Sequence, residues 1–269
     1  WLEGLGASTG TIFHLGAISA TTERDPVALL DNNVAFSTAL WRWCAAQDTR
    51  LIYASSAATY GDGANGFDDD PDPRALVALE PLNGYGKSKQ LFDIDAAMMA
   101  RMGCSPPQWA GLKFFNVYGP NEYHKAGQRS VAVQLFEQIS ASGRAKLFRS
   151  HHADYEDGGQ LRDFIWVGDC VDIMLWLYDK PGVSGIFNCG TGEARSFADL
   201  ARACFQAMER EEAIEFIDTP ESLREHYQYF TEARMERLRA AGYTQPFTSL
   251  EDGVASYIRG YLQTNDPYR

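Results

Sequence analysis

Short apolar segments alternate with longer segments of helical periodicity along the first two thirds of the chain. The apolar segments are typical of buried strands and cover residues 11–17, 50–56, 109–119, 162–167 and 185–190. Helical spacing of apolar residues covers residues 26–47, 86–102 and 169–179. Nearly continuous apolar strands that alternate with helices predict a parallel sheet covered on both faces.

The last third of the chain, residues 191–269, has a different pattern. Three segments there carry amphipathic helical patterns, namely 196–208, 230–242 and 249–262. They predict a smaller, mostly helical part attached to the sheet. Two stretches between the apolar segments, 61–81 and 149–160, are rich in Gly, Asp, Pro or other polar residues and are predicted to be loops.

The start of the chain lacks the usual opening of a nucleotide-binding sheet. A doubly wound sheet of that kind opens with a strand, a glycine-rich turn and a helix. No GxGxxG motif occurs, and "GLGASTG" at 4–10 has neither a strand before it nor a helix after it. We therefore expect a doubly wound, Rossmann-like α/β fold that is N-terminally truncated and lacks its first β-α-β unit.

Composition narrows the class of protein. The 269 residues are 45% hydrophobic, enough for one large domain or two smaller ones. The net charge of −12 disfavours nucleic-acid binding, and no apolar run is long enough to span a membrane. Five cysteines without a CxxC pair fit a reducing cytoplasm, and five histidines without HExxH spacing predict no metal site. We expect a soluble, cytoplasmic protein.

Tyr85 and Lys89 stand four positions apart at the start of a predicted helix, in "NGYGKSKQLFD". Residues at this spacing share one helix face. A neighbouring ammonium group favours the phenolate and is expected to lower the phenol pKa, which suits proton transfer. The spacing alone is also common by chance on surface helices.

The stretch "YASSAATYG" at 53–61 places Ser55 and Ser56 at the carboxyl end of a predicted strand. Ligands bind at this edge of open α/β sheets. A hydroxyl there can hold a carbonyl or alcohol oxygen while a phenol exchanges its proton. For Ser55, capping of a turn is an equally good interpretation; for Ser56, Tyr85 favours the functional one.

Together these motifs resemble the extended short-chain dehydrogenase/reductase superfamily. Within it, the chain is most similar to the ADP-L-glycero-D-manno-heptose 6-epimerase family. The similarity runs almost from end to end and includes "IFHLGAISATTERD", "YGKSK", "GPNEYHK", "RDFIWVGD" and "GVSGIFNCGTGEARSF".

The resemblance implies a catalytic set of four residues. Tyr85 corresponds to the acid/base tyrosine, and Lys89 to the lysine that orients the nicotinamide ribose and lowers the phenol pKa. Ser56 corresponds to the serine that completes this triad. Lys125 corresponds to a second acid/base residue, although a solvated loop lysine is the alternative interpretation.

The same resemblance implies residues that bind the cofactor and the substrate. The implied cofactor contacts are Leu15, Gly16, Ala17, Ile18, Ser19, Asn32, Lys89, Val117 and Lys125. The implied substrate contacts are Ser56, Asn116, Gly127, Gln134, Phe148, Arg149, Ser150, His151, Arg162 and Tyr227. Gly127 and Gln134 depart from the serine and histidine found in other members, and the two acidic loops are longer here.

Some of these positions also have an ordinary structural interpretation. Asn116 can satisfy backbone groups at a strand end, Phe148 can be a core residue, and Arg162 beside Asp163 can form a surface ion pair of little energetic value. The diphosphate of the implied substrate needs local donors in this acidic chain. From their residue types, Arg162, Arg149 and Lys146 are candidates, with Arg preferred for its planar fork.

The implied reaction is an inversion at C6 of an ADP-heptose through a transient 6-keto intermediate, with tightly held NADP rather than NAD, for lipopolysaccharide inner-core precursors. Two bases on opposite sides suit an inversion. The family also implies a homo-oligomer, a pentamer by resemblance. Alternatives are another nucleotide-sugar 4-epimerase, 4,6-dehydratase or reductase, or a non-catalytic dinucleotide-binding protein.

We expect two domains that interleave along the chain. Residues 1–118 and about 162–190 are assigned to dinucleotide binding, with about 227–242 as a further candidate segment. Residues of about 119–161 and 191–269 are assigned to the substrate domain.

Overall fold

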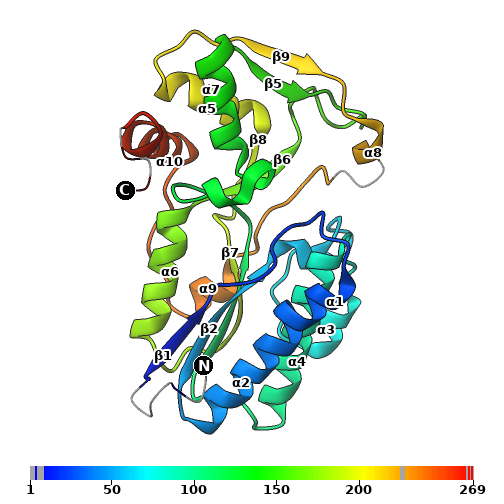
Figure 1. The fold of residues 1–269 in the computed structure, drawn as a ribbon, viewed down its shortest axis with the longest axis vertical. Coiled ribbons are helices and arrows are strands. Elements are labelled where there is room, and N and C mark those ends of the chain that lie inside the picture. The colour runs from blue at the N-terminus through cyan, green and yellow to red at the C-terminus, as the bar shows by residue number, and fades with distance from the viewer. Residues whose placement is uncertain (1–3, 5–8, 225–227, 265, 267, 269) are drawn as a thin grey trace. The chain divides into compact units, whose positions relative to one another are not determined.

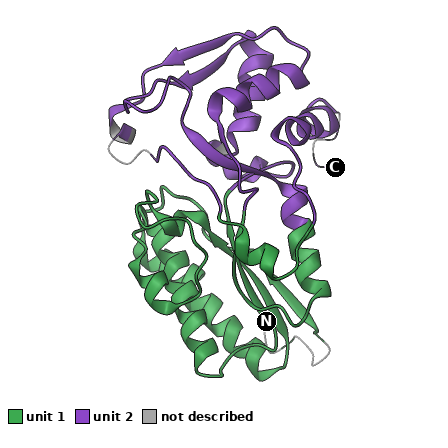
Figure 2. Cartoon of the chain, turned by 180° about the vertical axis from the view of Figure 1, so that it is seen from behind, with its two compact units in different colours: residues 1–115, 172–189, 234–244 green, residues 116–171, 190–233, 245–269 purple. Residues whose placement is uncertain are grey.

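The computed structural model describes residues 4, 9–224, 228–264, 266 and 268. Contacts between residues divide the chain into two compact units (Figure 2). Unit 1 contains residues 1–115, 172–189 and 234–244, and unit 2 contains residues 116–171, 190–233 and 245–269. The two units therefore interleave along the chain. The assignment of dinucleotide and sugar binding to separate domains stays a prediction.

Unit 1 is built on a four-stranded parallel sheet. Its strands are ordered β1 (Thr11–His14), β2 (Arg50–Ser56), β3 (Trp109–Phe114) and β7 (Gly185–Cys189). The residues of β7 are all buried, and β2 and β3 are buried at nearly every position. This continuous burial explains why the strands lack polar alternation, and the predicted parallel α/β sheet is confirmed.

Helices cover both faces of this sheet (Figure 1). One face carries α1 (Pro26–Leu29), α2 (Phe36–Ala46), α3 (Pro73–Ala78) and α4 (Gly84–Arg101). A π-helical segment, Leu30–Ala35, joins α1 to α2, and a 3-10 helix, Ala57–Tyr60, follows β2. The other face carries α9 (Glu236–Ala240) and the C-terminal part of α6 (Val167–Asp179). Aromatic rings fill the first layer, where Trp41 of α2 packs edge-on against Phe92 and Trp109.

Unit 2 combines two small sheets with helices. One sheet has the order β4 (Asn116–Tyr118), β6 (Leu161–Trp166) and β8 (Ala194–Ser196), and the other pairs β5 (Ala145–Phe148) with β9 (Ile214–Ile217). The helices are α5 (Val131–Ser142), α7 (Phe197–Ala207), α8 (Glu221–Arg224), α10 (Leu250–Tyr257), a 3-10 helix Tyr123–Gln128 and a π-helical segment Ile258–Leu262. Their apolar faces meet in one core that includes Val133, Ile139, Leu200, Phe205 and Val254.

The structure differs from the sequence prediction in three elements. The single strand predicted over 109–119 is divided between β3, which pairs with β2 and β7, and β4, which pairs with β6. The predicted loop 61–81 contains α3, which begins with an Asp72 cap and Pro73. The helical pattern over 230–242 forms only the five residues of α9.

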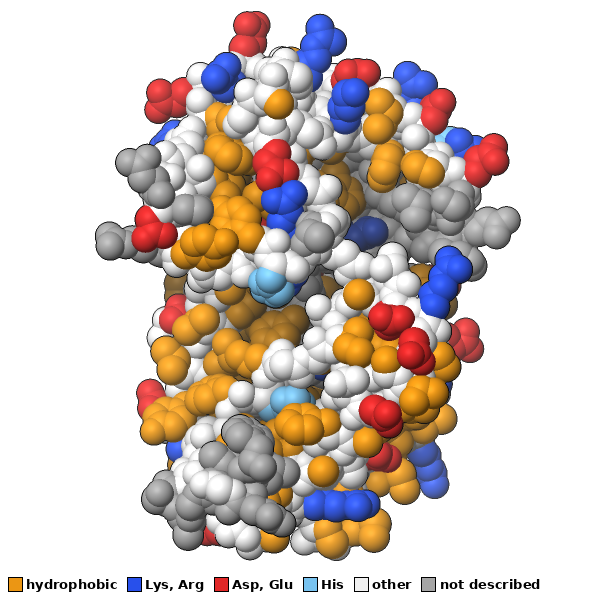
Figure 3. Space-filling model, viewed as in Figure 1, with side chains coloured by type: hydrophobic (Ala, Val, Ile, Leu, Met, Phe, Trp, Pro, Cys, Tyr) orange, Lys and Arg blue, Asp and Glu red, His pale blue; other side chains and the backbone are white. Residues whose placement is uncertain are grey.

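The β1 edge of the unit 1 sheet has an apolar surface. Phe13 and Leu15 are exposed beside Phe36 and Tyr178, and the Phe13 and Tyr178 ring centroids lie 6.2 Å apart. Hydrophobic side chains gather over β1 and α6 in the space-filling view (Figure 3). Strand β1 forms this edge, and the predicted cofactor segment, residues 15–19, begins directly after it.

Candidate active site

The carboxyl end of β2 holds the predicted catalytic serine. The Ser56 hydroxyl accepts a hydrogen bond from the Ala58 backbone N–H at 3.1 Å and so caps the following 3-10 helix. The Thr59 hydroxyl donates to the Ser56 carbonyl at 2.9 Å. Ser56, rather than Ser55, is therefore the serine that caps the turn. This capping fixes its backbone while the side chain also meets Tyr85.

Tyr85 lies at the start of α4, whose first turn is capped by Asn83. The phenol is half-buried, and the Ser56 side chain lies close enough to lower its pKa by hydrogen bonding. Lys89, one turn further along the same face, is buried and donates from Nζ to the Ala54 carbonyl at 2.8 Å. Strand β2 and helix α4 thus bring Ser56, Tyr85 and Lys89 together as the sequence predicted, while their roles stay a prediction.

The electrostatics of this cluster differ from the expected lowering of the phenol pKa. Burial raises the Tyr85 pKa and the charge of Asp93 raises it further, whereas the hydrogen bond with Ser56 lowers it. Burial also lowers the Lys89 pKa to about 8, against the charge of Asp93, which raises it. The expectation is therefore wrong for this structure, because burial raises the Tyr85 pKa and the Lys89 ammonium group points at the Ala54 carbonyl.

The predicted cofactor segment after β1, residues 15–19, is held by an asparagine that sequence reasoning missed. The Asn33 side chain accepts from the Ile18 N–H at 2.8 Å and donates to the Ile18 carbonyl at 2.9 Å and to the Ser88 hydroxyl at 2.9 Å. Asn33 is 1% exposed, whereas the predicted contact Asn32 is exposed and donates to the Ala28 carbonyl. The doublet in "LLDNN" was the available signal, because one asparagine of such a pair on a helix faces inward.

The other residues of the cofactor segment leave room for a ligand. Leu15, Gly16 and Ser19 are exposed, and Ala17 and Ile18 are half-buried. A methyl group built on Gly16 meets no atom within 4 Å. The segment is thus fixed at its backbone by Asn33 and open at its surface.

Unit 2 holds Lys125 on a 3-10 helix that is anchored by a buried carboxylate. Glu122 accepts hydrogen bonds from the Ser130 hydroxyl at 2.6 Å and the Tyr257 hydroxyl at 2.9 Å, and its carbonyl accepts from the Lys125 N–H at 3.0 Å. Lys125 and Gly127 are exposed. Glu122, which sequence reasoning did not single out, thus determines where the Lys125 segment begins.

Three further predicted contacts lie close to this segment in the sequence. On β4, Asn116 is exposed and Val117 is half-buried. Gln134 is half-buried on the first turn of α5 and donates to the Arg129 carbonyl at 2.8 Å. The predicted contacts of Val117 with the cofactor and of Asn116 and Gln134 with the substrate stay predictions.

Residues 148–151 form the end of β5 and the start of the following loop. Phe148 and Ser150 are half-buried, and Arg149 and His151 are exposed. The Arg149 guanidinium forms ion pairs with Asp218 at 3.2 Å and Asp157 at 3.8 Å. These ion pairs connect the start of the loop to Asp157 near its end and to Asp218, which follows β9.

Aromatic rings pack at the same loop. The His152 ring centroid lies 5.3 Å from that of Tyr155 and 5.1 Å from that of Tyr229, and the Tyr229 hydroxyl accepts from the His151 N–H at 2.9 Å. The long loop is therefore ordered by ring packing against the segment that contains Tyr229.

Arg162 is 8% exposed, and its guanidinium is held by backbone carbonyls. It donates to the carbonyl of Leu161 at 2.8 Å and to that of Gln228, and it lies 5.5 Å from the Phe197 ring centroid. Its neighbour Gln228 belongs to the same segment as Tyr229, so Arg162 and residues 148–151 lie around one part of unit 2. The predicted contact Tyr227 lies outside the described residues.

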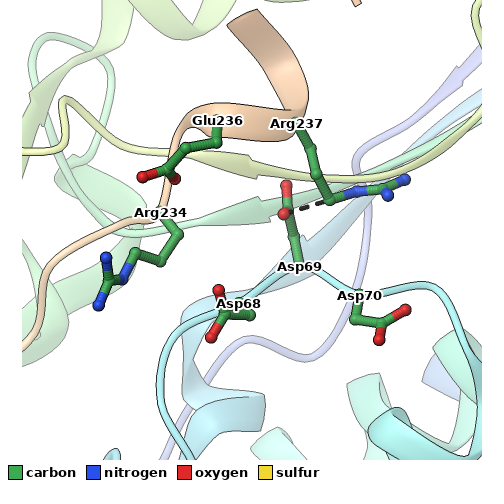
Figure 4. Close-up of a pocket in the computed structure, with 6 residues that line it drawn as sticks. All are labelled: Asp68, Asp69, Asp70, Arg234, Glu236 and Arg237. Carbon is green, nitrogen blue, oxygen red and sulfur yellow. Dashed lines mark ion pairs between the residues drawn. The ribbon is translucent and has the colours of Figure 1, made fainter. Parts of the chain in front are cut away.

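A separate cavity of about 460 Å³ opens in unit 1 (Figure 4). Its lining consists of four carboxylates and two guanidinium groups, from Asp68, Asp69, Asp70, Glu236, Arg234 and Arg237. Asp69 is 2% exposed, accepts from the Asn188 N–H at 2.8 Å, and lies 3.6 Å from Arg237. Burial raises its pKa to about 6. None of the predicted site residues line this cavity, and its acidic character does not fit an anionic nucleotide.

Two searches of the described residues bear on the class of protein. No cluster of three or more His, Cys, Asp or Glu side chains in that part of the chain is arranged to hold a metal ion. No helix there is both long enough and apolar enough to cross a membrane.

The sequence profile of the NAD dependent epimerase/dehydratase family matches residues 5–190. The chain belongs to this family. The matched range of the epimerase/dehydratase profile includes the Ser56, Tyr85 and Lys89 cluster and also Lys125 and Arg162.

Two curated relatives of this epimerase/dehydratase chain carry the same name. A protein of Nitratidesulfovibrio vulgaris (strain DP4) called ADP-L-glycero-D-manno-heptose-6-epimerase is 54% identical over 257 residues, covering 96% of this chain and 78% of the relative. A protein of Fusobacterium nucleatum with the same name is 47% identical over 263 residues, with the same two coverages. The crystal structure of the Helicobacter pylori ADP-L-glycero-D-manno-heptose-6-epimerase is similar in fold, with a TM-score of 0.75, 25% identity, and coverage of 93% of this chain and 72% of that one.

Proposed function

We propose that the protein is an NADP-dependent epimerase that inverts C6 of ADP-D-glycero-D-manno-heptose to give ADP-L-glycero-D-manno-heptose. The observation that carries the chemistry is that the Ser56 side chain lies beside the Tyr85 phenol and lowers its pKa, with Lys89 one helical turn away. The names of relatives at 54% and 47% identity support the substrate. On this proposal the product serves lipopolysaccharide inner-core synthesis in the cytoplasm.

The residues of unit 1 fit a nicotinamide dinucleotide. When bound, the nicotinamide supplies the redox chemistry by accepting a hydride from C6 of the sugar and returning it. Lys89 has three donor hydrogens, and within the described residues it donates one of them to the Ala54 carbonyl. The buried ammonium group can therefore also donate to ribose hydroxyls. The segment 15–19, fixed by Asn33 and open at Gly16, would line the same ligand.

Proton transfer is assigned to Tyr85 and Lys125. One group removes the proton of the C6 hydroxyl, and the other supplies a proton when the 6-keto intermediate has presented its opposite face. Because burial raises the Tyr85 pKa, the phenol keeps its proton at neutral pH. This favours Tyr85 as the group that supplies the proton. Ser56, beside Tyr85, would hold the oxygen that gains it.

Substrate binding is assigned to unit 2. Residues 148–151, Asn116, Gly127, Gln134, Arg162 and Tyr227 are proposed to contact the sugar nucleotide. For the diphosphate, the exposed Lys146 is proposed ahead of the two arginines. Arg162 already donates to two backbone carbonyls, and Arg149 is already ion-paired with two carboxylates. We also propose that the protein forms a homo-oligomer and prefers NADP to NAD.

Turnover of ADP-D-glycero-D-manno-heptose by four variants of the full chain tests this function. Tyr85→Phe and Lys125→Met should each reduce epimerisation by roughly 100-fold or more, since general acid–base groups contribute on this scale. Tyr178→Phe and Lys180→Met are matched controls at exposed positions outside the assigned set and should retain activity. Normal turnover by Lys125→Met would refute the assignment of two bases.

Two further measurements test the identity of the cofactor and of the substrate, independently of the proton-transfer residues. The dinucleotide released on denaturing the parent and the double variant Tyr85→Phe/Lys125→Met should be NADP in both. Release of NAD alone would refute the cofactor preference. Conversion of UDP-glucose but not ADP-heptose, or formation of a 4-keto-6-deoxy sugar, would instead identify a 4-epimerase or a 4,6-dehydratase.

A further inference from the structure

An ion pair is completely buried next to the carboxyl end of β2, in unit 1. Lys113 Nζ lies 2.8 Å from Asp93 Oδ2, and both side chains are 0% exposed. Two charges are costly to remove from water, and truncating one partner leaves the other unpaired. Neither residue belongs to the groups assigned to proton transfer, so the pair needs a separate explanation.

The hydrogen bonds of this pair lead to both sides of Ser56. Asp93 accepts from the hydroxyl of the preceding residue, Ser55, at 2.7 Å. Lys113 donates to the Thr59 hydroxyl at 2.7 Å, and Thr59 in turn donates to the Ser56 carbonyl at 2.9 Å. The pair is thus connected to the backbone of Ser56 through a neighbour before it and a neighbour after it.

Helix α4 adds a second connection. Tyr85, Lys89 and Asp93 follow at intervals of four residues and therefore lie on one helix face. Tyr85 lies beside the Ser56 side chain, and Lys89 donates to the Ala54 carbonyl. Asp93 joins the same helix to β2 through Ser55 and also accepts from the Tyr53 hydroxyl at 3.1 Å.

We propose that Asp93 and Lys113 are positioning residues, which fix residues 53–56 of β2 against α4 and so hold the Ser56 hydroxyl and the Lys89 ammonium group in place for proton transfer. The role in proton transfer rests on the proposed function. The positioning itself rests on the register of the strands, in which Ser55 pairs with Lys113. A displacement of about 1 Å at reacting groups is enough to reduce a rate by roughly 100-fold.

The carboxylate of Asp93 also acts on the charge of Lys89. Burial lowers the Lys89 pKa, and the negative charge of Asp93 opposes this effect. His14, at the end of β1, also faces Lys89, and burial together with the Lys89 charge lowers the His14 pKa to about 4. His14 is therefore neutral near pH 8 and does not share the titration of Lys89.

Two tyrosines near Asp93 also keep their protons near pH 8. Burial and the charge of Asp93 raise the pKa values of Tyr53, on β2, and Tyr60, on the 3-10 helix, well above their usual value. Lys113, on β3, remains paired with Asp93. Neutralising Asp93 is thus expected to move the Lys89 titration to lower pH.

The first test is a titration that does not depend on any substrate. The 13C chemical shift of each lysine Cε is followed against pH in the full chain, and the Lys89 signal is assigned with Lys89→Arg. We expect a midpoint at about 8 in the parent and a midpoint lower by roughly one pH unit in Asp93→Asn. Asp95→Asn, the same change on the same helix outside the network, should leave the midpoint unchanged. An unchanged midpoint in Asp93→Asn overturns the electrostatic part of the proposal.

The second test is kinetic. Asp93→Asn should reduce kcat by roughly 10- to 100-fold with KM changed less than about twofold, and should move the alkaline limb of the pH–rate profile to lower pH. Asp95→Asn should retain the parent kcat and profile. A variant with a normal kcat and profile per folded molecule, and only a lower stability, would show that the pair is merely structural.

Two provisions keep these outcomes decisive. If Asp93→Asn does not fold, Asp93→Asn/Lys113→Gln removes both charges, avoids an unpaired buried lysine, and carries the same kinetic prediction. The Lys89 midpoint should then fall by less than in Asp93→Asn, because a positive charge is removed together with the negative one. If the parent does not epimerise ADP-D-glycero-D-manno-heptose, the proposed function fails. The Lys89 titration then still decides whether Asp93 holds this ammonium group in its charged form.

Discussion

Replacing Lys89 by methionine is expected to stabilise the protein while it removes activity. The Lys89 side chain is 6% exposed, and burial lowers its pKa from 10.5 to about 8. At 1.36 kcal/mol for each pH unit, this change corresponds to about 3 kcal/mol by which the folded protein disfavours the ammonium form. The loss of the hydrogen bond to the Ala54 carbonyl offsets about 1 kcal/mol. We therefore expect a net gain of about 2 kcal/mol at pH 7.

The sign of this effect determines its pH dependence. Because the folded-state pKa of Lys89 lies below the unfolded value, the unfavourable contribution is complete below about pH 8 and disappears as the pH rises through 10.5. The gain from Lys89→Met should thus be largest near neutral pH and vanish in alkaline solution. Activity should fall because the ammonium group assigned to the cofactor ribose is absent.

Urea unfolding followed by circular dichroism measures this difference at pH 7 and pH 10.5. Lys87→Met is the matched control, since Lys87 is exposed on the same helix, and it should change the unfolding free energy by less than about 0.5 kcal/mol. A Lys89→Met protein that is less stable than the parent at pH 7, or equally stabilised at both pH values, would refute this account of the buried ammonium.

Substitutions of two buried carboxylates, Asp69 and Glu122, are expected to change the unfolding free energy in opposite directions. Burial raises the Asp69 pKa from 3.8 to about 6, so its unfavourable contribution is complete above pH 6 and absent below pH 4. Asp69→Asn should accordingly raise the unfolding free energy by about 3 kcal/mol at pH 7.5 and leave it unchanged at pH 4; a destabilised variant at pH 7.5 would contradict this. Glu122→Ala removes the acceptor of Ser130 and Tyr257 and should lower the unfolding free energy by about 2–4 kcal/mol. The exposed Glu137→Ala should cost less than about 1 kcal/mol, and equal losses in both variants would refute the anchoring role of Glu122.

Elements whose boundaries depend on local signals were predicted well from the sequence. Strand β2 has the predicted bounds, 50–56, and helix α4 begins two residues before the predicted start because Asn83 caps it. The division of 109–119 into β3 and β4 depends instead on two different partner strands, β2 and β6. Long-range pairing of this kind leaves no trace in the local pattern, since both strands are apolar.

Prediction of the candidate site was limited in the same way, by contacts and burial that exist only in the folded chain. The spacing of Tyr85 and Lys89 predicted that both lie on one helix face near Ser56, and the structure has this arrangement. The direction of the Tyr85 pKa was predicted wrongly, because burial is a property of the folded chain. Asp93 and Lys113 could not be paired from the sequence, since their contact depends on the register between β2 and β3.

The fate of the C6 hydrogen tests the proposed reaction most directly. ADP-D-glycero-D-manno-heptose carrying deuterium at C6 is converted by the parent protein in ordinary water, and the epimer is analysed by mass spectrometry and NMR. The account predicts complete retention of deuterium at C6 with inverted configuration, because the same hydride leaves and returns. Loss of the label to solvent, or the absence of any epimer, would contradict it.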